Sequence, residues 1–182
     1  MNIKKNQQPF FIGCICILYA CILFTGCDRQ QEKKEVDKAV MAFFSAYKQD
    51  SYREIDRRLF SDKLTKLLDQ ATEREKKEFD IVLKSDYPTD KPFMMDFDVF
   101  TSMPDGADSI RILQTTIKAD TAWVNVVFGI SDHNSKFEWN DQLVFIKNTT
   151  WKLDNVMYGE ENTTIKNLQD LLEDYIHAEN TY

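Results

Sequence analysis

The chain has 182 residues, of which 23 are lysine or arginine and 30 are aspartate or glutamate, so its formal net charge is −7. Phosphate backbones and anionic lipid headgroups repel such an acidic chain, so we expect no nucleic acid partner, and any membrane attachment needs a hydrophobic anchor. The length suits one domain with a hydrophobic core of its own.

The first 26 residues have the features of an export signal. Lys4 and Lys5 precede an almost uninterrupted apolar run, residues 9–24. Residues 24–27, Phe-Thr-Gly-Cys, resemble the lipobox at which bacterial lipoproteins are cut and acylated, so we expect acyl chains such as palmitate on Cys27. The alternatives are an uncleaved anchor, because the run approaches the ~20 residues that span a bilayer, and a plain secretory signal.

Cys27 is the only cysteine outside the leader, since the other three lie within the apolar run. A mature protein without disulfides must be held together by its core, even in an oxidising compartment. We therefore divide the chain into a signal peptide (residues 1–26), a lipidated tether (27–35) and a single domain (36–178). Its expected location is the bacterial cell envelope, lipid-anchored, and either periplasmic or exposed on the surface.

Apolar residues recur at helical spacing from 36 to 47 and predict a first helix. Ser51 and Glu54 form a capping-box pattern, which predicts a second, short helix that continues to Leu59.

Ser61 or Asp62 can cap a third helix, whose buried side would be Leu64, Leu67, Leu68 and Ala71. The charged run at residues 72–78 is interpreted as a solvated helix face or as a passage from helix to loop. The chain would then return to the core at Phe79, Val82 and Leu83.

Residues 85–109 contain three of the four prolines, which predicts an ordered loop with one short strand at 95–100. The loop also carries six aspartates: Asp86, Asp90, Asp96, Asp98, Asp105 and Asp108. Their spacing does not fit a calcium loop, because Phe100 stands where the third ligand should be. We interpret them as turn-forming residues and expect no metal site.

Four strands are predicted at residues 109–118, 121–130, 136–147 and 150–158, joined by short turns into an antiparallel meander. A last helix is expected from about residue 164 to 178. The fold class is therefore α+β, with N-terminal helices packed on a curved four-stranded antiparallel sheet and with a C-terminal helix.

Asp141 is unusual in this register. If Ile130 pairs with Phe137, then Asp141 lies opposite Val126 on the apolar, core-facing side of the sheet. A buried carboxylate needs a partner, a water molecule or a proton, so Asp141 is the one candidate for an inward catalytic residue. The alternative is a structural residue at the sheet margin that reaches solvent or a backbone amide.

The opposite face of the sheet is more apolar than a solvated face should be. It carries Trp123, Val127, Val144 and Ile146. These residues predict an interaction surface for a partner, most simply a second copy of the chain. Coverage by the C-terminal helix is the alternative.

The order of these elements resembles the nuclear-transport-factor-like cone fold. More narrowly, three segments resemble the bacterial lipoprotein family called domain of unknown function 3828: Phe43, Phe44 and Tyr47 in the first helix, residues 85–93 in the middle, and the sequence Trp-Lys-Leu-Asp-Asn-Val at residues 151–156. The resemblance covers about residues 36–158. It implies the fold and supplies no catalytic residues.

The sequence contains none of the common enzyme motifs. His133 and His177 form no zinc-binding pattern, five glycines leave no room for a phosphate-binding loop, and no Gly-x-Ser-x-Gly motif exists. We therefore expect no cofactor and favour a non-catalytic binding or interaction module. The alternatives are a small-molecule enzyme of the isomerase or dehydratase type, with Asp141 in its pocket and Tyr47 or Tyr158 as a donor, and a periplasmic immunity protein.

Overall fold

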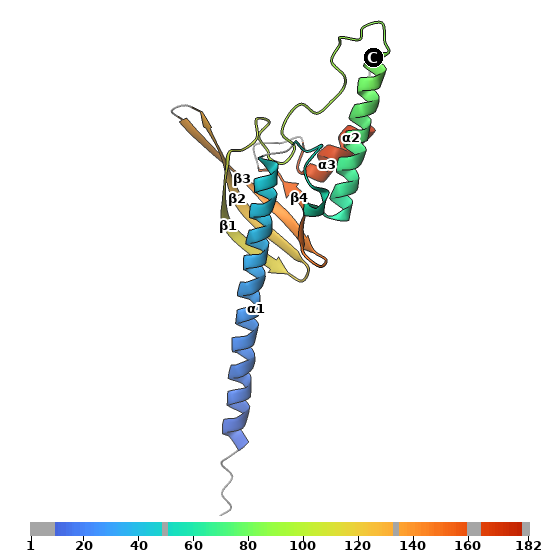
Figure 1. Ribbon diagram of the computed structural model, residues 1–182. Coiled ribbons are helices and arrows are strands. Elements are labelled where there is room, and N and C mark those ends of the chain that lie inside the picture. The colour runs from blue at the N-terminus through green and yellow to red at the C-terminus, as the bar shows by residue number, and fades with distance from the viewer. Residues whose placement is uncertain (1–9, 49–50, 133–134, 160–164, 180–182) are drawn as a thin grey trace, which may run out of the picture. The chain divides into compact units, whose positions relative to one another are not determined.

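The computed structural model describes residues 10–48, 51–132, 135–159 and 165–179, with side chains from residue 29 onward. The element order is α1 (Phe10–Tyr47), a 3₁₀ helix η1 (Arg57–Leu59), α2 (Asp62–Leu83), four strands and α3 (Leu168–His177) (Figure 1). The chain divides into two compact units, Met1–Glu35 and Val36–Tyr182. No helix within the described residues is long and apolar enough to cross a membrane.

The second unit is built around a four-stranded antiparallel open sheet. Its strands are β1 (Ser109–Lys118), β2 (Thr121–Asp132), β3 (Ser135–Lys147) and β4 (Trp151–Met157), and they lie side by side in chain order (Figure 1). The predicted register is confirmed, since Ile130 pairs with Phe137 and Asp141 with Val126. The first strand has its predicted ends, and no end of the other three strands differs from its prediction by more than two residues. The coarse fold class, α+β with three α-helices and one antiparallel sheet, is thus established.

One face of the sheet forms the core, as the alternation of side chains in β2 and β3 predicts. The C-terminal part of α1 packs there: the ring centroids of Phe44 and Phe128 lie 6.2 Å apart, and Phe43 contacts Phe60 and Phe100. The apolar sides of α2 and α3 close the same cluster near β4 through Leu64, Leu67, Leu68, Leu168, Leu171 and Leu172.

The predicted second helix is wrong. Ser51 begins only one turn, in which the amides of Glu54 and Ile55 donate to its carbonyl oxygen. Asp56 then caps the separate helix η1, because its carboxylate accepts a hydrogen bond from the Arg58 amide at 2.9 Å. A second local cap, directly after the turn, thus divides the segment.

Helix α2 begins as predicted, with the Leu64 amide donating to Ser61 Oγ at 3.0 Å. The interpretation of residues 72–78 as a solvated face holds for Glu73, Lys76 and Lys77, which are exposed. It is wrong for Glu75 and Glu78, which are buried on the same side of the helix as Leu64 and Ala71. Val82 returns to the core as expected, whereas Phe79 (58% exposed) and Leu83 (56% exposed) do not.

The loop that follows α2 contains no strand at residues 95–100, contrary to prediction. The Asp98 carboxylate accepts hydrogen bonds from the amides of Phe100 (2.8 Å) and Thr101 (2.9 Å), which turns the chain where a strand would run straight. Helix α3 begins four residues later than predicted because Asn167 caps it, accepting from the Asp170 amide at 3.0 Å. Residues 160–164, where the prediction placed its start, lie outside the described residues.

Candidate functional site

Asp141 lies at the centre of β3 and is only 4% exposed, as the register predicts. Its Oδ2 accepts hydrogen bonds from the Ser102 amide at 2.9 Å and from Trp139 Nε1 at 3.3 Å, and its Oδ1 accepts one from the Gly159 amide at 2.8 Å. Three N–H donors from three segments therefore compensate the buried carboxylate. These donors are the partners that a buried carboxylate at position 141 needs, and the fold itself supplies them.

Asp98 is the second inward carboxylate, and sequence reasoning had placed it among the turn-forming residues. Beyond its two backbone hydrogen bonds, it lies beside Tyr47, whose hydroxyl accepts from the Ala107 amide at 2.7 Å. Burial raises the pKa of Asp98 to about 6. Burial, and then the nearby Asp98 charge, raises the pKa of the Tyr47 phenol.

The loop backbone is fitted closely around this pair. Gly106 has φ +75°, and a Cβ atom there would lie 2.6 Å from the Tyr47 hydroxyl oxygen and 3.1 Å from Asp98 Oδ2. Only glycine adopts this conformation without strain and leaves room for the two polar groups.

Tyr158 completes an inner polar cluster, which we define as Tyr47, Asp98, Asp141 and Tyr158. Its hydroxyl donates to the Val99 carbonyl at 2.6 Å, and its pKa is raised first by burial and then by Asp98 and Asp141. Both tyrosines proposed from the sequence therefore lie near a carboxylate, and each hydroxyl is engaged with the backbone of the 95–108 loop.

A cavity of about 290 Å³ opens beside part of this cluster. Its lining includes Tyr47, Tyr52, Arg53 and Asp98, but neither Asp141 nor Tyr158. The volume is at the lower limit of small-molecule sites. A proton transfer in this cavity would thus depend on Asp98, because Asp141 is not exposed to it.

Metal binding finds no support in the described part of the chain, where no group of three or more histidine, cysteine, aspartate or glutamate residues is placed to hold an ion. In the aspartate-rich loop, Asp96 is paired with Lys91, and Asp108 accepts from the Ser131 amide at 2.9 Å. His133 lies outside the described residues.

Two ion pairs that engage the buried glutamates of α2 were missed from the sequence: Arg53 with Glu75, and Arg74 with Glu78. Arg53 binds Glu75 through two nitrogens and donates to the Met95 carbonyl at 3.1 Å, while the Met95 amide donates to Glu75 at 3.0 Å. The first pair therefore fixes the start of the proline-rich segment to α2. Helical spacing could have indicated the burial of these glutamates, because Glu75 and Glu78 continue the apolar stripe of Leu64, Leu68 and Ala71.

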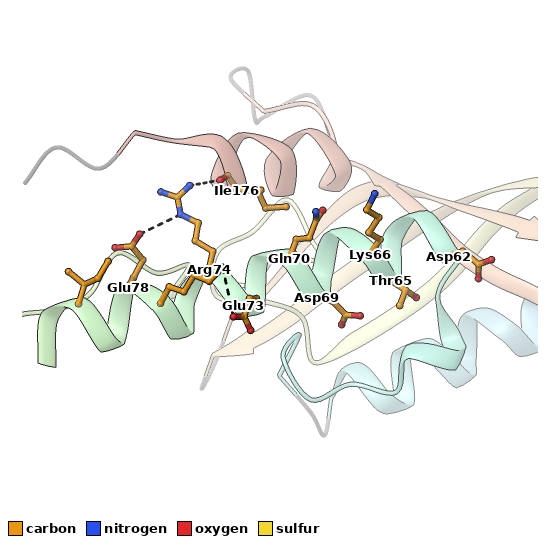
Figure 2. A pocket seen from close by; sticks show the side chains of 11 residues that line it. Asp62, Thr65, Lys66, Asp69, Gln70, Glu73, Arg74, Glu78 and Ile176 are labelled. Carbon is orange, nitrogen blue, oxygen red and sulfur yellow. Dashed lines mark hydrogen bonds and ion pairs between the residues drawn. The ribbon is translucent and has the colours of Figure 1, made fainter. Parts of the chain in front are cut away.

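Arg74 joins α2 to α3. It donates to the carbonyl oxygens of Tyr175, Ile176 and Ala178 at 2.5–2.6 Å, which are acceptors left open at the end of α3. Its guanidinium also lies over the rings of Phe93 and Tyr175, at 5.1 and 5.2 Å from their centroids. Figure 2 shows Arg74 directed at Glu78 and at Ile176.

The groove beside Arg74 is large, about 990 Å³, and open. Acidic residues such as Asp62, Asp69 and Glu73 alternate along α2 with basic residues such as Lys66 (Figure 2). Lys77 and Glu73 pair with each other across one helical turn. The mixed charges favour a solvated helix face over a selective binding site.

The outer face of the sheet carries the predicted interaction residues. Trp123, Val144 and Ile146 are half-buried and Val127 is buried, yet none of the four belongs to the core cluster. Helix α3 packs its apolar side into that core cluster instead, so the alternative in which it covers these four residues is not supported.

Comparison with known proteins gives no relatives: no family model, no curated protein and no solved structure matches the chain.

Proposed function

We propose that the protein is a lipid-anchored lipoprotein of the bacterial cell envelope whose α+β domain is a non-catalytic binding module. The anchor would be acyl chains on Cys27, and the binding surface would be the outer face of the sheet around Trp123, Val127, Val144 and Ile146. The fold would be the cone-like one of nuclear transport factor and of the lipoprotein family that the sequence resembles. Two register shifts, in β1 between Ile112 and Gln114 and at Val144/Phe145, support a bent sheet, because bulges increase local curvature.

The observation that carries this proposal is the hydrogen bonding of Asp141. A catalytic carboxylate must present an oxygen to its substrate. Both oxygens of Asp141 instead accept N–H donors from Ser102, Trp139 and Gly159. The inward residue by which the sequence pointed to catalysis is thus explained by the stability of the fold, whereas the apolar outer face has no structural explanation within the core.

Native mass spectrometry of the full chain, extracted gently from membranes, tests the binding module. We expect the wild type to carry a bound molecule or a second copy, and Trp123→Asp to lose it. Ile81→Asp is the matched control, because Ile81 is 53% exposed on α2, away from the sheet. A wild type that is monomeric and carries no added mass would contradict the proposal, and so would equal loss from the control variant.

The enzyme alternative would now depend on Asp98. Its pKa of about 6 and its place in the lining of the 290 Å³ cavity are the features a proton-transfer residue needs. This alternative predicts that small molecules bound by the protein perturb Asp98 and Tyr47. Carboxyl-detected NMR of Asp98 with and without the co-purified molecule tests it, and an unchanged Asp98 signal would exclude it.

A further inference from the structure

We infer that the outer face of the sheet binds an extended acidic polysaccharide. This inference rests on the proposed function, because it uses the same surface, and it names the chemical class of the partner. The strand register places outward side chains in rows across the four strands.

Two of these rows bring indole and amide groups together. One row consists of Thr116, Trp123, Val144 and Asn155. The next consists of Gln114, Asn125, Gln142 and Met157. In the second row Gln142 Nε2 donates to Asn125 Oδ1 at 2.7 Å, which fixes the two amides side by side. The face therefore offers a half-buried aromatic ring beside a row of fixed hydrogen-bonding groups.

The amide row argues against a protein partner. A stable protein interface has a continuous apolar centre surrounded by a polar rim. Here the polar row crosses β1, β2 and β3 and separates Trp123 and Val144 from Val127. Covering those amides with apolar groups would leave their hydrogen bonds unmade. Sugar rings suit the surface better, because their hydroxyls can bond to the amides while their C–H faces lie against the indole.

Charge on this face is opposite to that of the whole chain. The paired outward positions carry four cations, Arg111, Lys118, Lys136 and Lys152, and one carboxylate, Glu138. A second carboxylate, Asp154, stands unpaired in the β4 bulge and accepts a hydrogen bond from Gln169 Nε2 of α3 at 3.2 Å. Glu138 is engaged by Lys136 at 2.6 Å and Arg111 at 3.5 Å, which lower its pKa. The face is thus basic although the chain has a net charge of −7. The partner should therefore carry acid groups.

The positions of the cations indicate a chain-like ligand. One row runs across the sheet from Lys118 through Thr121 and Ile146 to Lys152, so a lysine stands at each end of it. Arg111 pairs with Val127, which lies in another row. Thr121 and Val127 lie six residues apart on β2, a distance of about 20 Å in a strand. Cations therefore stand at both ends of a track whose middle carries Trp123 and the amides. A single aromatic residue also fits a sugar chain better than a nucleic acid strand, in which successive bases need successive rings.

Titration of the full chain in a zwitterionic detergent with sodium polygalacturonate tests the inference. The change in tryptophan fluorescence is the readout, because a ligand on the outer face reaches the half-buried Trp123 while Trp139 and Trp151 are buried. We expect saturable binding that weakens as salt is added, with affinity for neutral dextran and for polyglutamate lower by about ten-fold or more. Replacing Lys118 and Lys152 together with alanine should weaken polygalacturonate binding by about ten-fold.

The control variant replaces Lys66 and Lys77 with alanine, two exposed lysines on α2 that give the same change in charge. It should bind polygalacturonate as the wild type does. Equal binding of dextran, equal binding of polyglutamate, or equal loss in the control variant would overturn the inference. If no polymer binds while Trp123→Asp still removes a co-purified partner, the inference fails and the proposed function stands.

Discussion

Replacing Asp141 with asparagine distinguishes a structural carboxylate from a catalytic one. The substitution preserves the shape of the side chain but changes one acceptor oxygen to an NH₂ donor. Asp141 accepts from the Ser102 and Trp139 nitrogens on one oxygen and from the Gly159 nitrogen on the other. Asparagine has only one acceptor oxygen, so in either orientation its NH₂ group faces at least one of these N–H donors.

The expected loss of stability follows from the number of donors left unpaired. Each buried donor without an acceptor costs about 1–3 kcal/mol. Asp141→Asn leaves one or two such donors and should lower the free energy of unfolding by about 1–6 kcal/mol. Asp141→Ala leaves three, so its loss should be larger, about 3–9 kcal/mol.

Urea unfolding followed by far-ultraviolet circular dichroism measures these differences. Asp120→Asn is the matched control, because Asp120 is exposed in the turn between β1 and β2, and its effect should stay within about 0.5 kcal/mol. A catalytic carboxylate is typically held at some cost to stability, so its removal would be neutral or stabilising. An Asp141→Asn variant as stable as the wild type would therefore refute the structural role.

Three further predictions follow. Burial raises the pKa of Asp98 in the folded protein to about 6, above its ordinary value of 3.8, so this group should add stability as pH falls from about 7 to 4. The gain in the free energy of unfolding should be about 2 kcal/mol after allowing for the partial exposure of Asp98. Asp98→Asn should remove that gain, measured from urea midpoints, and an unchanged gain would contradict its origin in Asp98. Arg74→Met should speed amide hydrogen exchange in α3, because the three terminal carbonyl groups of α3 lose their donor. Lys77→Met, the control, should leave the exchange unchanged. Equal protection of α3 in both variants would contradict the role of Arg74. Cys27→Ser should abolish metabolic labelling with alkyne-palmitate, and persistent label would refute lipidation at this residue.

The sheet could be predicted because its information is local. Side chains alternate with a period of two, and short turns between long strands leave one register that buries Val126, Phe128 and Leu143 together. The same rule placed Asp141 on the core face. Its partners could not be predicted, because Ser102 and Gly159 are 39 and 18 residues away and come from segments without periodicity.

The errors arose where polar residues decide the local structure. A charged run is ordinarily solvated, yet Glu75 is buried because Arg53, 22 residues earlier, neutralises it. The proline-rich loop was recognised, but the role of Asp98 within it depends on Tyr47 of a distant helix. The local cap at Asp56 was visible in the sequence and outweighed the capping box at Ser51.

The most direct test of the account uses ¹⁹F NMR of the full chain labelled with 5-fluorotryptophan. Its three tryptophans report on different places: Trp123 on the outer face, Trp139 beside Asp141 in the inner polar cluster, and Trp151 in the core. A soluble extract of envelope polymers and metabolites is added stepwise. A binding module that uses the outer face predicts that the Trp123 resonance shifts while the Trp139 and Trp151 resonances stay in place. A shift of Trp139 with Trp123 unchanged would place the binding site inside the domain and contradict the account.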